Sequence, residues 1–288
     1  MIEILTSIMI YGIIFGSTYV LISLGYTLVY GVGKILNIAH GAFYLITAYI
    51  FYLIRDELFF PFPLAIIFSL IITMIIGALT HILLIKPMHE NEIAILIVTF
   101  ALAFFIEQFI TFRWGFSMLY FPPIIPGSTQ VLGVSVYYRR IFLVIATIII
   151  VVSFMIFIKK SRIGKSIRAV SQDKEAAMLS GINSERIITY TLIISGFLVG
   201  IAAILQVPGT STAPHRGWGI LTSAFAVVIL GGLGSIKGTV IAAYIIGISE
   251  SLVGELWEYT YAALVPLIIV LIVLIIRPRG LFGKKEVK

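Results

Sequence analysis

Cysteine is absent from the 288 residues of this chain, and charged residues make up only 11% of them. Without cysteine the chain forms no disulfide and offers no thiol for redox chemistry. The scarcity of charge accompanies 60% hydrophobic residues and a mean hydropathy of +1.12, which excludes a soluble domain of this length. The composition therefore predicts an integral membrane protein built from α-helices.

Positive charge is in excess, with a net charge of +7. Such an excess is also typical of nucleic-acid-binding proteins. Here the Lys and Arg residues cluster in links beside hydrophobic segments, where the preference for basic residues on the cytoplasmic side explains them. We therefore predict no nucleic-acid partner. The start of the chain carries Glu3 and no Lys or Arg, so it lacks the basic region of a cleaved signal, and the first hydrophobic segment is expected to be retained.

Hydrophobic segments that approach the roughly 20 residues of a membrane span recur along the chain. Nine spans are predicted, within a range of eight to ten, and no Pro- or Ser-rich linker divides residues 1–288, which indicates a single domain. The pieces 220–230 and 240–252 are each short for a span, which leaves half-helices as an alternative there. The nine segments are 4–30, 31–54, 64–85, 93–112, 141–158, 187–205, 220–230, 240–252 and 261–276.

Small, polar and proline residues give some of these segments and links a distinct character. Gly12 and Gly16, four apart in the first segment, allow close packing of another helix. The front of the second segment, residues 31–41, is rich in Gly and polar residues, so it is expected to be bent or buried in protein. Prolines exclude a span from 113–140, where the alternation over 130–138 suggests a small hairpin or an extended piece.

The longest polar run, residues 159–186, sets the predicted orientation. It carries seven Lys and Arg residues against three Asp and Glu residues, and such basic links are rarely translocated, so it is placed in the cytoplasm. The alternation of segments then places the N-terminus outside and the basic C-terminal tail inside. The link 113–140 falls outside, and its Arg113, Arg139 and Arg140 are the main exception to this charge rule.

The second half of the basic run predicts a short helix over 171–181. Ser171 is expected as its N-cap, and Asp173 and Glu175 suit the positive end of a helix. Gly181 supplies the left-handed residue that ends it. A short capped helix between two spans on the cytoplasmic side suits the docking of another protein.

An apolar face and a second cap complete this pattern. Ala176 and Leu179, three residues apart, form a small apolar face on the short helix. Asn183 or Ser184 is expected to cap the next helix, which enters the membrane at Ile187.

Enzymatic and metal chemistry are not predicted from the remaining motifs. The letters GKS at 164–166 lack the earlier glycine of a phosphate-binding loop, because position 159 is Lys, and no strand precedes them. Ser195 has no base at a recognisable spacing. The histidines at 40, 81, 89 and 215 are too scattered for a catalytic dyad or a metal site.

Polar residues inside hydrophobic segments are costly and mark candidates for function. Asn37 and His40 either line a transport pathway or cap the second helix, and the capping role is favoured. Glu107 and Gln108 either line the pathway or, in the case of Glu107, lie near the outer interface beside Arg113. Both interpretations of Glu107 stay open. Another acidic residue, at position 250, is expected at the membrane interface.

Four stretches of the chain carry the strongest motifs. They are LNIAHGAFYLITAYI at 36–50, RAVSQDKEAAMLSGINSERI at 168–187, AFAVVILGGLGSIKGTVIAAYIIGISESL at 224–252 and RPRGLFG at 277–283. In this order they resemble segments of the permeases of branched-chain amino acid ABC transporters, of the LivH type, and the resemblance covers nearly the whole chain. Thr47 stands where those permeases often have Gly, and Ala242 and Ala243 replace their usual small pair.

The short helix also resembles, in part, the permease motif EAA-x3-G that docks ATP-binding subunits. The rest of that motif departs, because Thr191, Ile193 and Ile194 stand where Ile, Leu and Pro are expected, a departure usual for the branched-chain group. The resemblance implies docking roles for Asp173, Glu175, Ala176, Ala177, Leu179 and Gly181.

The resemblance implies an all-α polytopic bundle in the cell membrane, arranged like the type II ABC importers and surrounded by lipid. It implies two ATP-binding subunits that use ATP and Mg, whereas this chain itself binds no cofactor. It also implies a second permease, identical or of the LivM type, and an extracytoplasmic binding protein that delivers a branched-chain amino acid. ATP-driven closure would then move the short helix and switch access from outside to inside.

Other interpretations stay open beside this one. A urea or short-amide permease of the same family is close in sequence, and sugar permeases are a more distant option. A stand-alone secondary carrier would need charged groups at mid-membrane for ion coupling, and the chain offers few. A membrane enzyme is the third alternative.

Overall fold

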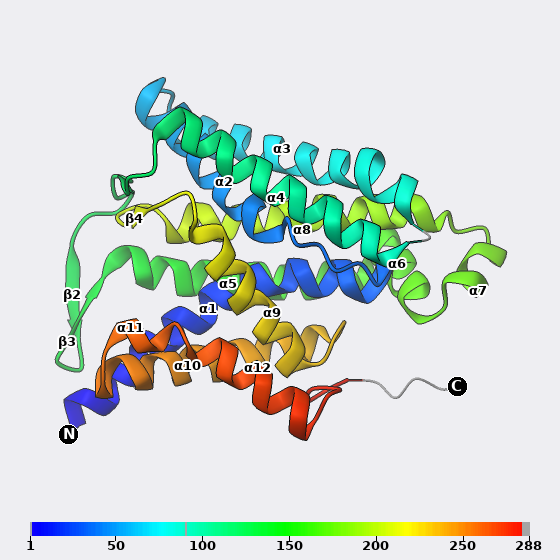
Figure 1. Ribbon diagram of the computed structural model, residues 1–288. Helices are drawn as coiled ribbons and strands as arrows, with labels where there is room; N and C mark the ends of the chain where they lie inside the picture. Colours follow the sequence, from blue (N-terminus) through cyan, green and yellow to red (C-terminus); the bar gives the residue numbers. More distant parts are fainter. Residues whose placement is uncertain (1, 90, 284–288) are drawn as a thin grey trace.

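The computed structural model describes residues 2–89 and 91–283, which form an elongated bundle of helices that run mostly along one direction (Figure 1). A π-helical turn η1, Leu53–Glu57, continues α2, and the turns η2, Thr80–Ile85, and η3, Lys86–Met88, continue α3. The helices are α1 Ile2–Gly33, α2 His40–Tyr52, α3 Phe62–Leu79, α4 Glu92–Trp114, α5 Tyr138–Lys160, α6 Arg162–Gln172, α7 Lys174–Leu179, α8 Ser184–Gln206, α9 Arg216–Gly231, α10 Ile236–Leu256, α11 Tyr259–Ala262 and α12 Val265–Ile276.

The long hydrophobic segments of the sequence become helices of membrane-spanning length. Within residues 2–89 and 91–283, seven helical stretches are long and apolar enough to cross a membrane, whereas α2 has 13 residues and α9 has 16. The protein is therefore a polytopic helical membrane protein, as predicted, but the count of nine spans is not confirmed. The half-helix alternative applies to α9 alone, because α10 extends to 21 residues.

The helices differ in how much of their surface the bundle covers. The spans of α1 and α8 are 67% buried and lie at the centre, whereas those of α3, α4 and α5 are no more than 28% buried. Helices that present so much apolar surface suit contact with lipid, since lipid chains are as apolar as the side chains they touch. The core thus gathers around α1 and α8.

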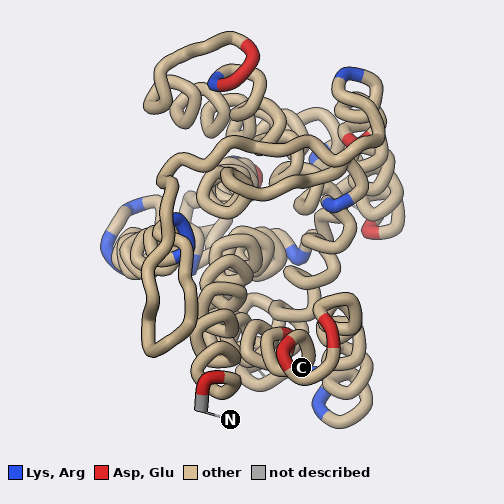
Figure 2. Tube along the Cα trace, turned by 90° about the vertical axis from the view of Figure 1, so that its left-hand side faces the viewer, with Lys and Arg blue, Asp and Glu red and all other residues tan. Residues whose placement is uncertain are grey.

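The chain alternates between the two ends of the bundle. The N-terminus, α11 and the hairpin of β2, Ser128–Val131, and β3, Val134–Tyr137, lie at one end (Figure 1). The helices α6 and α7 and the end of α12 lie at the other. The links are therefore grouped at the two ends as the charge pattern predicts. Which of the two ends faces the cytoplasm stays a prediction. Figure 2 looks along the bundle from the N-terminal end and shows charged residues as short coloured segments on mostly tan helices.

Small residues let α1 and α10 approach closely. A Cβ added at Gly12 would lie 2.8 Å from the Cα of Ile248, and one added at Gly16 would lie 2.9 Å from the Cα of Tyr244. Gly247 of α10 faces the same two glycines. The predicted packing at Gly12 and Gly16 is confirmed, and its partner is α10.

The front of the second hydrophobic segment is bent, as predicted. Helix α1 continues to Gly33, and α2 begins only at His40, so residues 34–39 form an irregular link between them. The predicted span therefore starts nine residues later than its hydrophobic segment does, at 40 rather than 31. The link is held inside protein, because most of its residues are buried or half-buried.

The link after α4 contains the predicted hairpin. Strands β2 and β3 pair in antiparallel register, and the turn between them has Leu132 at φ 51° and Gly133 at φ 85°. Two consecutive residues with positive φ make the tight turn that suits the twist of two-residue hairpins. A second short pairing joins β1, Leu119–Tyr120, to β4, Ser211–Thr212, and so ties this link to the segment that precedes α9.

The basic run 159–186 folds as two helices where the sequence predicted one. The first, α6, begins at Ser161, whose hydroxyl oxygen accepts a 2.8 Å hydrogen bond from the Gly164 amide. Its buried residues are Gly164, Ile167 and Val170, three apart. This spacing is the signal for α6, and the many basic residues between its members concealed it.

The C-terminal tail returns to the bundle and closes the end of α9. The amide of Leu281 donates a 2.8 Å hydrogen bond to the Leu230 carbonyl, and that of Phe282 donates a 3.1 Å bond to the Gly231 carbonyl. The last carbonyls of a helix have no partner within it, so these two bonds supply what the end of α9 lacks. Residues 284–288, which complete the predicted basic tail, lie outside the described residues.

Candidate functional site

One candidate site is α7, at the end of the bundle opposite the β2–β3 hairpin. Asp173 is its N-cap, since its Oδ1 accepts a 2.9 Å hydrogen bond from the Ala176 amide. The prediction of Ser171 as the cap is wrong. Ser171 belongs to the last turn of α6, and its hydroxyl donates to the carbonyl of Arg168, so the aspartate two residues later is the side chain in position to cap.

The turn after α7 follows the predicted pattern. Gly181 has φ +81°, the left-handed conformation that ends a helix. Of the two residues expected to start the next helix, Asn183 is the cap, because its Oδ1 accepts a 3.0 Å hydrogen bond from the Arg186 amide. Ser184 is buried within the first turn of α8.

Most of the surface of α7 is exposed, and only Ala177 is buried. Leu179 is 91% exposed, Met178 is about half exposed, and Ala176 and Glu175 are exposed as well. Ala177 points the other way and is buried in the core of its own chain, so it is not free for the subunit contact that the motif implied. The exposed apolar atoms of α7 therefore lie on a rigidly held, two-turn helix.

Glu185, in the first turn of α8, links α7 to a third helical segment. Its Oε1 lies 3.6 Å from Lys174 Nζ of α7, and its Oε2 lies 3.8 Å from His81 Nε2 of η2. On the other side of the ring, His81 Nδ1 lies 2.9 Å from the hydroxyl of Thr189. The Glu185 carboxylate therefore lies between α7, its own helix α8 and the π-helical end of α3.

Asn37 and His40 are buried around the start of α2. Asn37 Oδ1 accepts a 3.1 Å hydrogen bond from the Ala39 amide within the link before α2, whereas α2 itself has no side-chain cap, so the predicted capping role is not found. None of the described residues bonds its Nδ2. His40 Nε2 lies 2.8 Å from the Ile22 carbonyl of α1, and its Nδ1 lies 3.3 Å from the Ser195 hydroxyl of α8. His40 thus ties three helices together.

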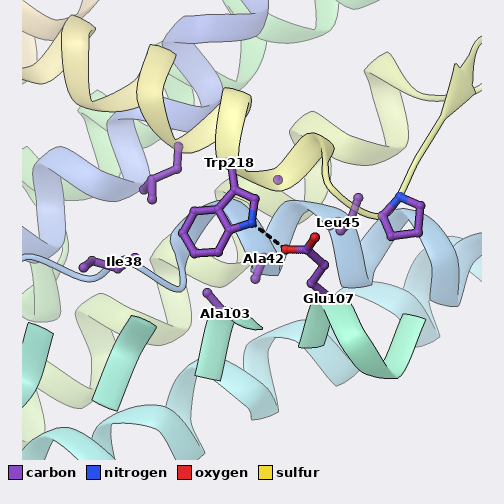
Figure 3. Close-up of a pocket in the computed structure, with 9 residues that line it drawn as sticks. Ile38, Ala42, Leu45, Ala103, Glu107 and Trp218 are labelled. Atoms are coloured by element: carbon purple, nitrogen blue, oxygen red, sulfur yellow. Dashed lines mark hydrogen bonds between the residues drawn. The ribbon is translucent and has the colours of Figure 1, made fainter. Parts of the chain in front are cut away.

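The second candidate site surrounds the start of α9, inside the bundle. A Cβ on Gly41 of α2 would overlap the carbonyl oxygen of Gly217, so α9 begins directly against the α2 backbone. The indole Nε1 of Trp218 donates a hydrogen bond to Glu107 Oε2 of α4 (Figure 3). The cavity beside this pair is about 10 Å³, room for about one water molecule. The other labelled residues that line it are Ile38, Ala42, Leu45 and Ala103.

The two neighbouring polar residues of α4 lie in different places. Glu107 lines this cavity, whereas Gln108 is exposed and does not line it. Arg113, the arginine expected beside Glu107, pairs instead with Glu57 Oε2 at 2.7 Å. The carboxylate of η1 therefore takes the interface role, and Glu107 is turned inward to the tryptophan of α9.

Glu250 is buried inside the bundle, and its position near the membrane interface stays a prediction. Its side chain turns into the bundle, where Oε2 accepts a 2.6 Å hydrogen bond from the hydroxyl of Tyr19 of α1, and the residue is 7% exposed. Arg216, the first residue of α9, is exposed and lies within electrostatic reach of Tyr19 and Tyr44. The carboxylate of Glu107 therefore meets α9 at Trp218, whereas that of Glu250 is bonded to Tyr19 of α1.

Three of these residues were not found from the sequence. Arg216 and Trp218 fell in a link assigned to the outside, because the hydrophobic run was taken to begin at 220. Pro214, two residues before Arg216, was the available signal, since proline often stands just before or at a helix start. Tyr19 gave no signal, because a tyrosine in a long apolar helix is ordinarily a packing residue.

Known protein families and relatives were compared with the chain. The family described as branched-chain amino acid transport system / permease component matches residues 8–274. The chain is 29% identical to the high-affinity branched-chain amino acid transport system permease protein BraD of Pseudomonas aeruginosa, over 96% of this chain and 95% of that one. It is 28% identical to the permease protein LivH of Escherichia coli over the same shares. It is also 28% identical to a probable LivH of Methanocaldococcus jannaschii, over 94% and 90%. No solved structure matches.

Proposed function

Because this chain belongs to the family of branched-chain amino acid transport permease components, we propose that it is the membrane-spanning subunit of an ATP-driven importer for branched-chain amino acids. The chain is a multi-pass protein of the cell membrane and a transport subunit rather than an enzyme. ATP is hydrolysed by two separate subunits, and a binding protein outside delivers the amino acid to this permease and a second one.

The observation that carries the coupling part of this proposal is the build of α7. Its start is capped by Asp173, its end is fixed by Gly181, and Leu179 is 91% exposed between them. An exposed leucine on a well-capped short helix is suited to a cleft of another protein. Burial of its side chain there would stabilise the complex by about 1.5–3 kcal/mol. In this proposal the ATP-binding subunits supply that cleft.

A continuous set of contacts leads from α7 toward the start of α9. Glu185 connects α7 to α8, and farther along α8 the Ser195 hydroxyl meets His40. The next residue of α2, Gly41, lies against Gly217 of α9. Closure of the ATP-binding subunits would move α7 and α8 and thereby shift α9, which is how access to a substrate could switch between two discrete arrangements.

Co-purification tests the docking role. The tagged chain is expressed with its ATP-binding subunits, as wild type and as Leu179→Asp, with Leu132→Asp as the matched control. Leu132 is also an exposed leucine, at the hairpin tip on the opposite end of the bundle. We expect Leu179→Asp to lose the ATP-binding subunits and leucine uptake, and Leu132→Asp to keep both. Full retention of these subunits by Leu179→Asp would refute docking on α7.

The same preparation separates the alternatives. A stand-alone carrier would transport without any ATP-binding subunit, so uptake by the purified chain alone would overturn the proposal. Labelled leucine and labelled urea, each supplied with the binding protein, decide between an amino acid and a short amide as the substrate.

A further inference from the structure

Two hydrogen bonds of one kind, from a tryptophan indole to a glutamate, occur in the described part of the chain, and their surroundings differ. Trp114 Nε1 donates to Glu57 Oε1 at 2.6 Å, and Trp218 Nε1 donates to Glu107 Oε2 (Figure 3). The Glu57 carboxylate also pairs with Arg113, whose Nη2 lies 2.7 Å from its Oε2. The charge of Glu57 is therefore balanced by a cation beside it.

Glu107 has no such cation. None of the residues that the structure describes forms an ion pair with it. Glu107 stands seven residues before α4 ends at Trp114, which at 1.5 Å per residue places it about 10 Å from the helix end. An ionisable side chain inside a membrane-spanning helix is costly, and such groups mark substrate or ion pathways. The group that Glu107 lacks, and that Glu57 has, is a positively charged partner.

The cavity that Glu107 lines is otherwise apolar, apart from the Trp218 indole. Ala42 and Leu45 of α2 and Ala103 of α4 lie around the carboxylate (Figure 3). The cavity is about 10 Å³, room for about one water molecule, so an amino acid fits only after it has widened. A carboxylate beside small apolar side chains is suited to a ligand that combines a cation with an apolar group.

Trp218 bridges the two helices that would have to part. Helix α9 packs mainly on α1, α2, α10 and α12, and α4 is not among its main packing partners. The Trp218 indole supplies contacts across this gap, because it bonds Glu107 and lies against Phe100 of α4, with ring centroids 5.4 Å apart. Movement of one side chain therefore frees the Glu107 carboxylate and widens the cavity without separating the closely packed helices.

We propose that Glu107 binds the ammonium group of an amino acid in transit, and that the Trp218 indole occupies this carboxylate while the pathway is closed. Both donors use the same oxygen, and a hydrogen bond from a charged ammonium is stronger than one from a neutral indole. The apolar lining then contacts the branched side chain. This inference rests on the proposed transport function and adds the substrate chemistry, since a neutral amide such as urea brings no cation to Glu107.

The test uses the complete transporter in proteoliposomes, with ATP inside and leucine-loaded binding protein outside. Leucine uptake and ATP hydrolysis are measured together for Glu107→Gln, Glu107→Asp and Trp218→Phe. Glu107→Gln keeps an oxygen that accepts from Trp218 and removes the charge, whereas Trp218→Phe keeps the charge and removes the donor. We expect Glu107→Gln to lower leucine uptake per ATP about tenfold or more, because the substrate ammonium is left unpaired.

The order of the variants separates recognition from a structural role. We expect Glu107→Asp to regain part of the uptake and Trp218→Phe to lose less than Glu107→Gln. Glu57→Gln is the matched control, since it makes the same change in the other tryptophan–glutamate pair, and it should match wild type.

Three results would overturn the proposal. They are wild-type uptake per ATP in Glu107→Gln, a larger loss in Trp218→Phe than in Glu107→Gln, and a parallel loss of uptake and ATP hydrolysis in Glu107→Gln. The last two indicate that the Trp218–Glu107 bond only holds the fold. A wild-type complex that hydrolyses ATP but carries no leucine would instead refute the proposed function, and this inference with it.

Discussion

Gly16 of α1 and Gly247 of α10 lie backbone to backbone where the two helices cross. A Cβ on Gly247 would overlap the amide nitrogen of Gly16 and would lie 2.7 Å from the carbonyl oxygen of Gly12. In a membrane, helix association depends on close packing, because lipid offers side chains the same apolar surroundings as protein. This contact therefore sets the position of α10, the helix that carries Glu250.

Replacing Gly247 by valine is expected to destabilise the bundle by about 1–3 kcal/mol, the usual effect of overpacking a tight contact. The neighbouring atoms belong to the α1 backbone, which cannot rotate aside as a side chain can. Thermal unfolding of the purified protein in detergent should show a lower midpoint, and less of the protein should elute as a folded species.

Gly219→Val is the matched control for this stability measurement. Gly219 is also a helical glycine, in α9, but an added Cβ there meets no described atom within 4 Å. Its unfolding midpoint should stay close to wild type. An unchanged midpoint for Gly247→Val would show that α1 and α10 can separate at little cost.

Gly181→Val is expected to leave membrane insertion intact but to uncouple ATP hydrolysis from uptake. The residue has φ +81°, and no described atom lies within 4 Å of an added Cβ, so the only penalty is backbone strain of about 1–2 kcal/mol. The strain is relieved by re-angling the turn between α7 and α8. Leucine uptake per ATP, measured in proteoliposomes, should fall.

Gly115→Val also places a β-branched residue at a positive φ, at a different place in the bundle. Gly115 follows α4 with φ +83° and open space around it, at the opposite end of the bundle from α7. Coupling should be normal in this variant. Normal uptake in Gly181→Val as well would count against a docking role for α7.

Glu185→Gln is expected to weaken coupling with little loss of stability. The variant keeps the shape of the side chain and removes the charge that faces Lys174 and His81. Because the Lys174 pair is partly exposed, its loss should change the free energy of unfolding by less than about 1 kcal/mol. Leucine uptake per ATP should fall while ATP hydrolysis continues.

Glu57→Gln is the control for Glu185→Gln. It breaks the ion pair with Arg113, which lies at the end of the bundle opposite α7. Coupling in Glu57→Gln should match wild type. If Glu185→Gln also couples normally, α7 transmits its movement through the backbone of the turn rather than through the carboxylate.

The absence of cysteine gives the orientation a direct test. Ser180→Cys places a thiol on the exposed end of α7, and Leu132→Cys places one at the hairpin tip. A membrane-impermeant thiol reagent applied to intact cells should label position 132 and spare position 180. Labelling at 180 from outside would reverse the orientation and remove α7 from the reach of cytoplasmic ATP-binding subunits.

The sequence predicted what depends on local composition. Hydrophobic length found the long helices, the prolines and alternation around 130 found the hairpin, and Gly181 marked the end of α7. These features follow from residues close together in the chain, so a pattern can indicate them. Helix α6 was missed because its apolar positions, Ile167 and Val170, are separated by basic residues that suggested an open loop.

The candidate site depended on contacts that no local pattern contains. Glu250 is buried because Tyr19, 231 positions away, offers it a hydroxyl. Glu107 binds Trp218 rather than Arg113 because the chain between them folds back and brings α9 against α4. Polarity alone identified Glu107 as a candidate, but its partner Trp218 is set by the packing of α9 against α1, α2 and α10, which no local pattern contains.

The bonds from Leu281 and Phe282 to the last turn of α9 make this helix dependent on the very end of the chain. During synthesis, α9 leaves the ribosome before α10, α11 and α12. The amides of Leu281 and Phe282, which bond its last carbonyls, are made after all three. Nascent chains that stop short of the tail carry every transmembrane helix and still lack a finished α9. The two backbone bonds that close α9 can therefore form only after residues 281 and 282 have been made.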